Sequence, residues 1–220
     1  MPSPTYITRF RDCTIDIIAR QDSINWILNV HAHHRFSPLT AFLSVNYFDR
    51  FLSSHSLPVT LFQKKKKKRK AFSNADRHSG SWPSKLLSVA CLSLAAKMGE
   101  PKVQFILDLQ IFEPKFVFDP KTVQRMELRV MWILNWRLRS ITPFDFLHHF
   151  VSDLSSSSSS LLSASSDLVL STIRVIDFLG FSPSTIAGAA VLCAAGLSVD
   201  FVADGDRQGA PFFYERVNKV

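Results

Sequence analysis

The chain has 220 residues, of which 46% are hydrophobic, enough to bury the core of one large domain or of two small ones. Its net charge of +8 comes largely from a single run that supplies seven positive charges and leaves only +1 for the rest, which argues against a basic face that follows nucleic-acid phosphates. This basic run consists of Lys64, Lys65, Lys66, Lys67, Lys68, Arg69 and Lys70.

The cysteines and the apolar runs indicate in which cellular compartment the protein is expected. Cys13, Cys91 and Cys193 are far apart, and two of them lie in apolar helical runs, which favours free thiols in a reducing environment. Charges at residues 9, 11 and 12 are not typical of a signal peptide. The longest uncharged run near the C-terminal end, residues 184–199, is shorter than the ~20 residues of a membrane span. We therefore expect a soluble intracellular protein with no membrane partner.

Residues 1–140 are predicted to form a compact all-α domain, because their apolar residues repeat with the helical period. Its five predicted helices cover residues 23–33, 37–52, 82–98, 103–111 and 119–134. The third has no charge, glycine or proline between Lys85 and Lys97, and its apolar residues point in every direction. A helix of that kind must be buried on all sides, so we expect it to be the axis of a bundle.

The segment 59–81 has neither a helical nor a strand period, and it holds the basic run. Structureless loops of this length are uncommon inside compact domains, and crowded like charges repel and stay solvated. We expect this segment to be disordered.

A second helical region follows Thr142-Pro143. Its predicted helices cover residues 144–154, 167–179 and 184–199, with a serine-rich loop at 155–160 and a further helical start at 212. The region repeats the order of the first, outer helices and then an all-apolar one, but it ends about one helix later. Residues 141–220 are therefore predicted to be a partial second helical domain.

Asp49 falls on the apolar stripe of the second predicted helix. Burying a lone carboxylate is costly unless it is paired. Arg20, just before the first predicted helix, is the best candidate, because a guanidinium binds a carboxylate through two hydrogen bonds. Such a pair would brace the crossing of the first two helices. The alternative is that Asp49 turns outward beside Arg50 as an ordinary surface charge.

Lys97 and Glu127 end two neighbouring apolar stripes. Taken singly, each is explained by a long side chain that reaches solvent, or by a lysine that favours the dipole at a helix C-terminus. Taken together, they would make a charged rim around a hydrophobic contact patch. The pattern favours a protein that binds a partner over one that turns over a substrate.

Several stretches resemble a known family. Residues 46–52 (Asn-Tyr-Phe-Asp-Arg-Phe-Leu), 82–98 and 125–128 (Arg-Met-Glu-Leu) resemble the cyclin box. Stretches similar to plant D-type cyclins are 22–27, 44–53 and 136–144. The resemblance extends over nearly all of the chain outside residues 59–81. It implies a five-helix cyclin box followed by a partial second cyclin-like domain, with both ends of the chain shortened.

The resemblance implies a regulatory subunit rather than an enzyme. Such a subunit binds and activates a cyclin-dependent kinase at the G1-to-S transition, in the nucleus as well as the cytoplasm, without a cofactor. Carried over by position, Lys97 and Glu127 match the pair that contacts the kinase's regulatory helix. Arg20 and Asp49 match the family's buried ion pair, and Leu86 matches its core leucine.

The resemblance also bears on other partners. Trp26 matches the tryptophan of the patch that docks substrates and inhibitors, although Ala19, Asp22 and Ser23 replace larger apolar residues frequent there. The Leu-x-Cys-x-Glu motif expected near the start of a D-type cyclin is absent, which leaves docking to a retinoblastoma-type protein without its usual motif. Gly99 stands where the family usually has an acidic residue.

Three interpretations of residues 59–81 remain open. The first is a retained intron or a faulty gene model, because nothing in the segment resembles a turn that the fold needs. The chain would then be a non-functional product of a mis-spliced cyclin gene. The second is a nuclear-import signal, and the third is contact with nucleic acid without sequence preference.

Two rival functions are disfavoured by the sequence. It shows no Gly-rich phosphate loop, activated nucleophile or suitably spaced carboxylate pair, so we expect no enzyme. His31, His33 and His34 have no cysteine or carboxylate nearby at ligand spacing, so we expect no metal site. A transcription factor with two cyclin-like boxes would stay basic without the basic run, whereas this chain falls to +1, so we expect no specific nucleic-acid partner.

Overall fold

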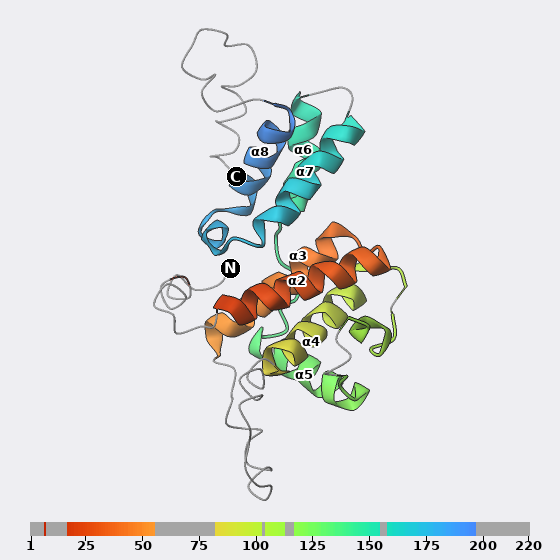
Figure 1. The fold of residues 1–220 in the computed structure, drawn as a ribbon. Helices are drawn as coiled ribbons and strands as arrows, with labels where there is room; N and C mark the ends of the chain where they lie inside the picture. Colours follow the sequence, from red (N-terminus) through yellow and green to blue (C-terminus); the bar gives the residue numbers. More distant parts are fainter. Residues whose placement is uncertain are drawn as a thin grey trace, which may run out of the picture. The chain divides into compact units, whose positions relative to one another are not determined.

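The computed structural model describes residues 7, 17–55, 82–102, 104–112, 117–154 and 158–196. All regular structure in these ranges is helical, which confirms the predicted all-α class. The chain divides into two compact units, residues 1–138 and 139–220 (Figure 1). The segment 59–81 and the helical start predicted at 212 lie outside the described residues.

In the described part of the first unit, α2 (Ile17–His34) is followed by α3 (Pro38–Ser54). Helix α2 starts six residues before the predicted start at Ser23. The sequence analysis placed Arg20 ahead of this helix, whereas the structure places it inside. The start of α3 is the predicted one. Ser37 caps the helix by accepting a hydrogen bond from the Leu39 amide at 3.3 Å, and Pro38 occupies the first helical position.

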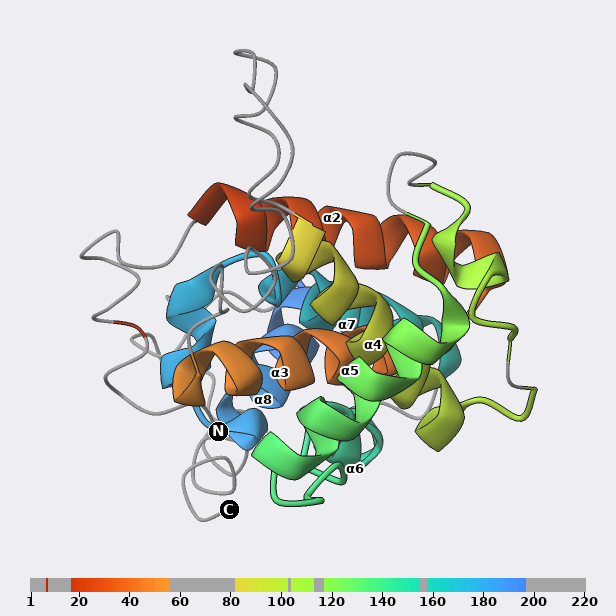
Figure 2. The ribbon, with the colours of Figure 1, turned by 90° about the horizontal axis from the view of Figure 1, so that it is seen from below.

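Helix α4 (Trp82–Gly99) is the predicted axis of the first unit. Every residue from Leu86 to Ala96 is buried, and the helix packs against α2, α3 and α5 (Figure 2). The buried residues of α4 include the small side chains of Ala90, Ala95 and Ala96. The serine hydroxyls within α4 can turn back to the helix itself, as Ser88 does by donating to the Ser84 carbonyl at 2.8 Å.

The helix predicted over residues 103–111 is wrong. Residues 104–107 form an irregular turn, followed only by the short 3-10 helix η3 (Asp108–Gln110). A helix of this length is marginal in water unless packing supports it. Here the buried Gln110 side chain donates to the carbonyls of Ile106 and Phe118 and accepts from the Phe118 amide at 2.7 Å. These bonds hold the segment as a loop that leads into α5 (Pro120–Ile133).

The second unit contains α6 (Phe144–Leu154), α7 (Ser158–Thr172), η4 (Ile176–Gly180) and α8 (Pro183–Ala194). Helix α8 is the predicted all-apolar helix, and it packs on α6 and α7. Within the described residues, no helix combines the length and the apolar character needed to cross a bilayer.

Two expectations for α7 are corrected. Residues 158–160 were expected to be loop but are helical, and the helix predicted to reach 179 ends at Thr172. Serines fit into this helix because they donate to the carbonyl four residues earlier, as Ser165 does to Leu161 at 2.7 Å. Ser165, Val169 and Ile173 are buried at helical spacing, so the side of α7 that faces its neighbours begins earlier than the apolar pattern indicated.

Candidate partner-binding site

Lys97 and Glu127 are brought together by the crossing of α4 and α5. Lys97 lies in the last turn of α4, and its Nζ donates to both carboxylate oxygens of Glu127, at 2.6 and 2.7 Å. The Glu127 side chain is only 7% exposed, whereas that of Lys97 is 37% exposed. The glutamate therefore lies in the apolar stripe of α5, and the lysine is the member of the pair that is exposed to solvent.

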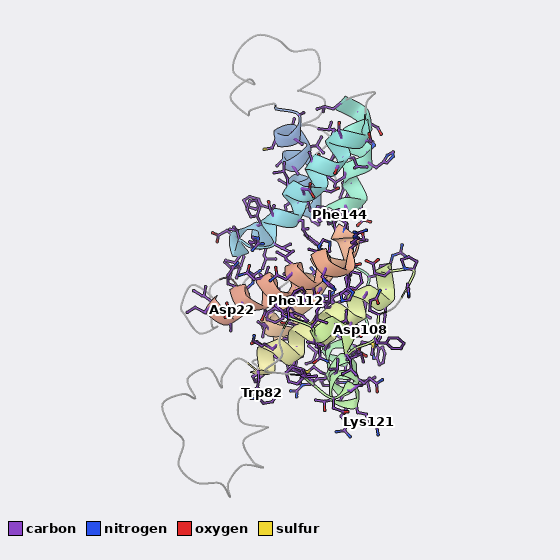
Figure 3. All side chains as sticks on the ribbon, turned by 45° about the vertical axis from the view of Figure 1, so that its right-hand side comes forward. Asp22, Trp82, Asp108, Phe112, Lys121 and Phe144 are labelled. Carbon is purple, nitrogen blue, oxygen red and sulfur yellow. The ribbon has the colours of Figure 1, made fainter. Side chains whose placement is uncertain are left out.

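Exposed apolar side chains flank this pair in the sequence. Met98 follows Lys97 and is 52% exposed, and Leu128 follows Glu127 and is 55% exposed. Trp132, one helical turn beyond Leu128, is 67% exposed. The side chains of α5 are drawn in Figure 3, where Lys121 marks its first turn. Large apolar side chains left in water beside a neutralised ion pair are typical of a protein contact surface.

Arg20 and Asp49 form a buried pair between α2 and α3. The Nε and Nη2 atoms of Arg20 donate to the two carboxylate oxygens of Asp49, both at 2.8 Å. The side chains are 3% and 1% exposed. The outward orientation that the sequence left open for Asp49 does not occur. Leu86, the third residue assigned to the core, is also buried, on α4.

Trp26 is buried on α2, with 7% of its surface exposed, and its indole Nε1 has no hydrogen-bond partner among the described residues. Ser23, in the place of a docking-patch residue, is buried and donates to the Ala19 carbonyl at 2.7 Å. Docking of a substrate on Trp26 stays a prediction, and it would require more of the ring to become exposed than in this structure.

Glu100 is a structural residue that the sequence analysis missed. Its Oε1 accepts from the Ser37 amide at 2.8 Å and from the Thr40 hydroxyl at 2.5 Å, so a carboxylate just after α4 lies at the positive N-terminus of α3. A Cβ on Gly99 would lie 3.1 Å from the Thr40 hydroxyl, so glycine there permits the close approach. No local pattern marks Glu100, because its partners lie on another helix.

The basic run, residues 64–70, lies outside the described residues. His34 Nε2 is 3.2 Å from the Asp108 carbonyl, and His33 packs edge-on against Phe112. Burial lowers the pKa of His31, against the opposing effect of Glu100. Among the described residues, no three histidine, cysteine or acidic side chains are grouped as metal ligands.

Comparison with known proteins identifies the family to which this fold belongs. The chain matches the model of the cyclin N-terminal domain over residues 1–139 and that of the cyclin C-terminal domain over residues 141–200. The chain belongs to the cyclin family. Cyclins are regulatory proteins, so the family agrees with the expected class of regulatory subunit.

This cyclin is similar to plant D-type cyclins, which confirms the resemblance found in its sequence. It is 43% identical to Cyclin-D1-1 of Arabidopsis thaliana over 198 residues, which is 89% of this chain and 53% of that protein. It is 42% identical to Cyclin-D4-1 of the same plant, covering 59% of it, and 43% identical to Cyclin-D2-1 of Oryza sativa subsp. japonica, covering 54% of it. The chain thus spans about half the length of the curated relatives it matches.

A solved structure shows the same fold. The crystal structure of a viral cyclin from herpesvirus saimiri superimposes on this cyclin with a TM-score of 0.67, covering 94% of this chain and 79% of the viral one. The sequences are only 14% identical, so the similarity concerns the fold alone.

Proposed function

We propose that this cyclin binds and activates a cyclin-dependent kinase and thereby promotes the G1-to-S transition. The observation that carries the proposal is the Lys97–Glu127 pair at the surface end of the α4–α5 crossing. A protein kinase is active only when its regulatory helix is in position, because that helix supplies the glutamate of an internal lysine–glutamate pair. A partner that holds this helix therefore controls the kinase without taking part in the chemistry.

The Lys97–Glu127 pair has hydrogen-bonding capacity left for such a helix. A lysine ammonium has three donors, and two of them are directed at Glu127. The Glu127 carboxylate accepts these two bonds and retains further lone pairs. The ends of a helix carry unpaired carbonyl and amide groups. A free donor on Lys97 and a free acceptor on Glu127 fit these groups, while Met98 and Leu128 supply apolar area.

The finer parts of the proposal have separate support. Similarity to plant D-type cyclins supports the G1-to-S assignment, and the basic run at residues 64–70 supports import into the nucleus. Kinase inhibitors and substrates are proposed as further partners through Trp26. These assignments rest on relatives of which the chain spans only about half the length.

The test compares binding of a plant cyclin-dependent kinase to the unmodified chain and to the double variant Lys97→Ala, Glu127→Ala. Truncating a desolvated charge pair in an interface costs 2 kcal/mol or more, so we expect the dissociation constant to rise about 30-fold or more. Lys121→Ala, an exposed lysine in the first turn of the same helix, is the matched control and should bind like the unmodified chain.

The outcomes separate the parts of the proposal. A folded double variant that binds as tightly as the unmodified chain would show that the pair is not the contact. Absence of binding by every form, including the control, would refute kinase regulation by this chain and favour the product of a mis-spliced gene.

A further inference from the structure

The chain after α5 turns sharply and returns to α3. Asn135 and Trp136 have φ angles of 52° and 61°, in the left-handed region, and the Trp136 amide donates to the Met131 carbonyl at 2.8 Å. Two residues later, the Leu138 carbonyl accepts a hydrogen bond from the hydroxyl of the buried Tyr47 at 2.8 Å. The end of the first unit is thereby fixed on α3.

The Tyr47–Leu138 hydrogen bond brings the chain segments that contain Arg50 and Arg137 together. Arg50 lies three residues after Tyr47 on α3, so the two side chains share a face of the helix. Arg137 directly precedes Leu138. Burial lowers the pKa of Arg50, Tyr47 opposes this effect, and the charge of Arg137 adds to it.

Neither arginine has an acidic partner within the described part of the chain. Arg50 is half-buried, and its terminal nitrogen Nη1 is buried without a hydrogen-bond partner. Asp49, its neighbour in the sequence, is bound to Arg20. A buried donor left unsatisfied costs free energy of folding, and a second cation beside it adds repulsion. The fold thus maintains two positive charges together without compensating them.

We propose that Arg50 and Arg137 form a binding site for a phosphate group. Guanidinium groups present planar sets of donors that match phosphate oxygens, and partial burial strengthens such bonds. Two positive charges without a carboxylate favour a doubly charged phosphate over a singly charged carboxylate. The Tyr47 hydroxyl already donates to Leu138, so it positions the site and leaves binding to the arginines. The proposal does not depend on kinase binding.

The test titrates the full chain with inorganic phosphate at constant ionic strength and follows the thermal unfolding midpoint by tryptophan fluorescence. All four tryptophans lie in the first unit, so the signal reports on the unit that holds the site. We expect a saturable rise in the midpoint. Arg50→Met and Arg137→Ala should each weaken phosphate binding about tenfold or more, since a hydrogen bond to a charged group is worth ~1.5–3 kcal/mol.

Two controls keep the result interpretable. The basic run attracts phosphate as well, but it is intact in both variants and in Arg125→Ala, an exposed arginine on α5 whose loss should leave the affinity unchanged. Arg50→Met removes an uncompensated charge, so its midpoint without phosphate should not fall. If that variant does not fold, Arg50→Lys keeps the charge but loses the planar donors, and it should also bind phosphate more weakly.

A second arm identifies the source of the phosphate group. Free O-phosphoserine that binds more tightly than inorganic phosphate would indicate a phosphorylated side chain, and the reverse order would indicate the free ion. The proposal is overturned if phosphate gives no saturable response, or if the response is the same in the unmodified chain and in the Arg50 and Arg137 variants.

Discussion

Replacing Arg20 by methionine is the sharpest test of how the first unit is held together. Methionine keeps most of the length and apolar stem of the side chain but removes both hydrogen bonds to Asp49. The carboxylate would then remain between α2 and α3, with its side chain only 1% exposed and without its guanidinium.

The expected cost follows from this burial. Removing one partner of a buried ion pair destabilises by about 3–5 kcal/mol, because the remaining charge is uncompensated. Since the whole stability of a domain is about 5–15 kcal/mol, the variant should be close to the limit of folding. Replacing both residues, Arg20→Met with Asp49→Leu, should recover most of the loss, since an apolar pair leaves no charge to compensate.

Urea unfolding followed by tryptophan fluorescence measures this cost. The signal reports on the first unit alone, because residues 26, 82, 132 and 136 are the four tryptophans. With a urea dependence of ~2 kcal/mol/M, the midpoint of Arg20→Met should fall by about 1.5–2.5 M. Arg125→Ala, an exposed arginine on α5, should leave the midpoint nearly unchanged.

A loss below about 1 kcal/mol for Arg20→Met would refute this reasoning, since costs of that size are typical of solvated surface pairs. A double variant less stable than Arg20→Met would also contradict it, because the cost would then come from packing and not from the uncompensated charge.

Two further predictions concern the loop and the anchor of the first unit. Gln110→Ala should destabilise the unit by about 1–3 kcal/mol, since the Phe118 amide and carbonyl lose their partner. Amide hydrogen exchange at residues 117–119 should then accelerate, and unchanged exchange would contradict the role of Gln110. Burial raises the pKa of Tyr47 to about 12, so the folded chain keeps a proton that the unfolded chain loses above pH 10.0. The free energy of unfolding should therefore be constant in this respect below about pH 10 and fall as the pH rises towards 12. Tyr47→Phe should reduce this loss between pH 9 and 11 in urea unfolding, and an identical pH dependence of the two proteins would disprove the assignment.

The sequence was informative wherever a charge interrupts an apolar period. Asp49, Lys97 and Glu127 stand out in this way, because a charged residue on a buried stripe needs a partner whatever the details of the fold. The buried axis of the first unit could be predicted for the same kind of reason, since a helix without a polar face must be covered by other helices.

The features that could not be predicted depend on partners far away in the chain. Glu100 accepts a hydrogen bond from the Ser37 amide, which lies 63 residues earlier in the chain. The proximity of Arg50 and Arg137 follows from a hydrogen bond across 91 positions, between Tyr47 and Leu138. Hydrophobic periodicity describes one helix at a time, so it contains none of this information.

The burial of α4 sets an order of events during synthesis of the chain. Its neighbours α2 and α3 precede it, but α5 ends about 34 residues after Gly99. At ~5–20 residues per second, the ribosome needs about 2–7 s to add this stretch, and for that time one apolar side of α4 has nothing to cover it. A chaperone that binds apolar helices should therefore associate with nascent chains in which α5 has not yet emerged from the ribosome and release longer ones.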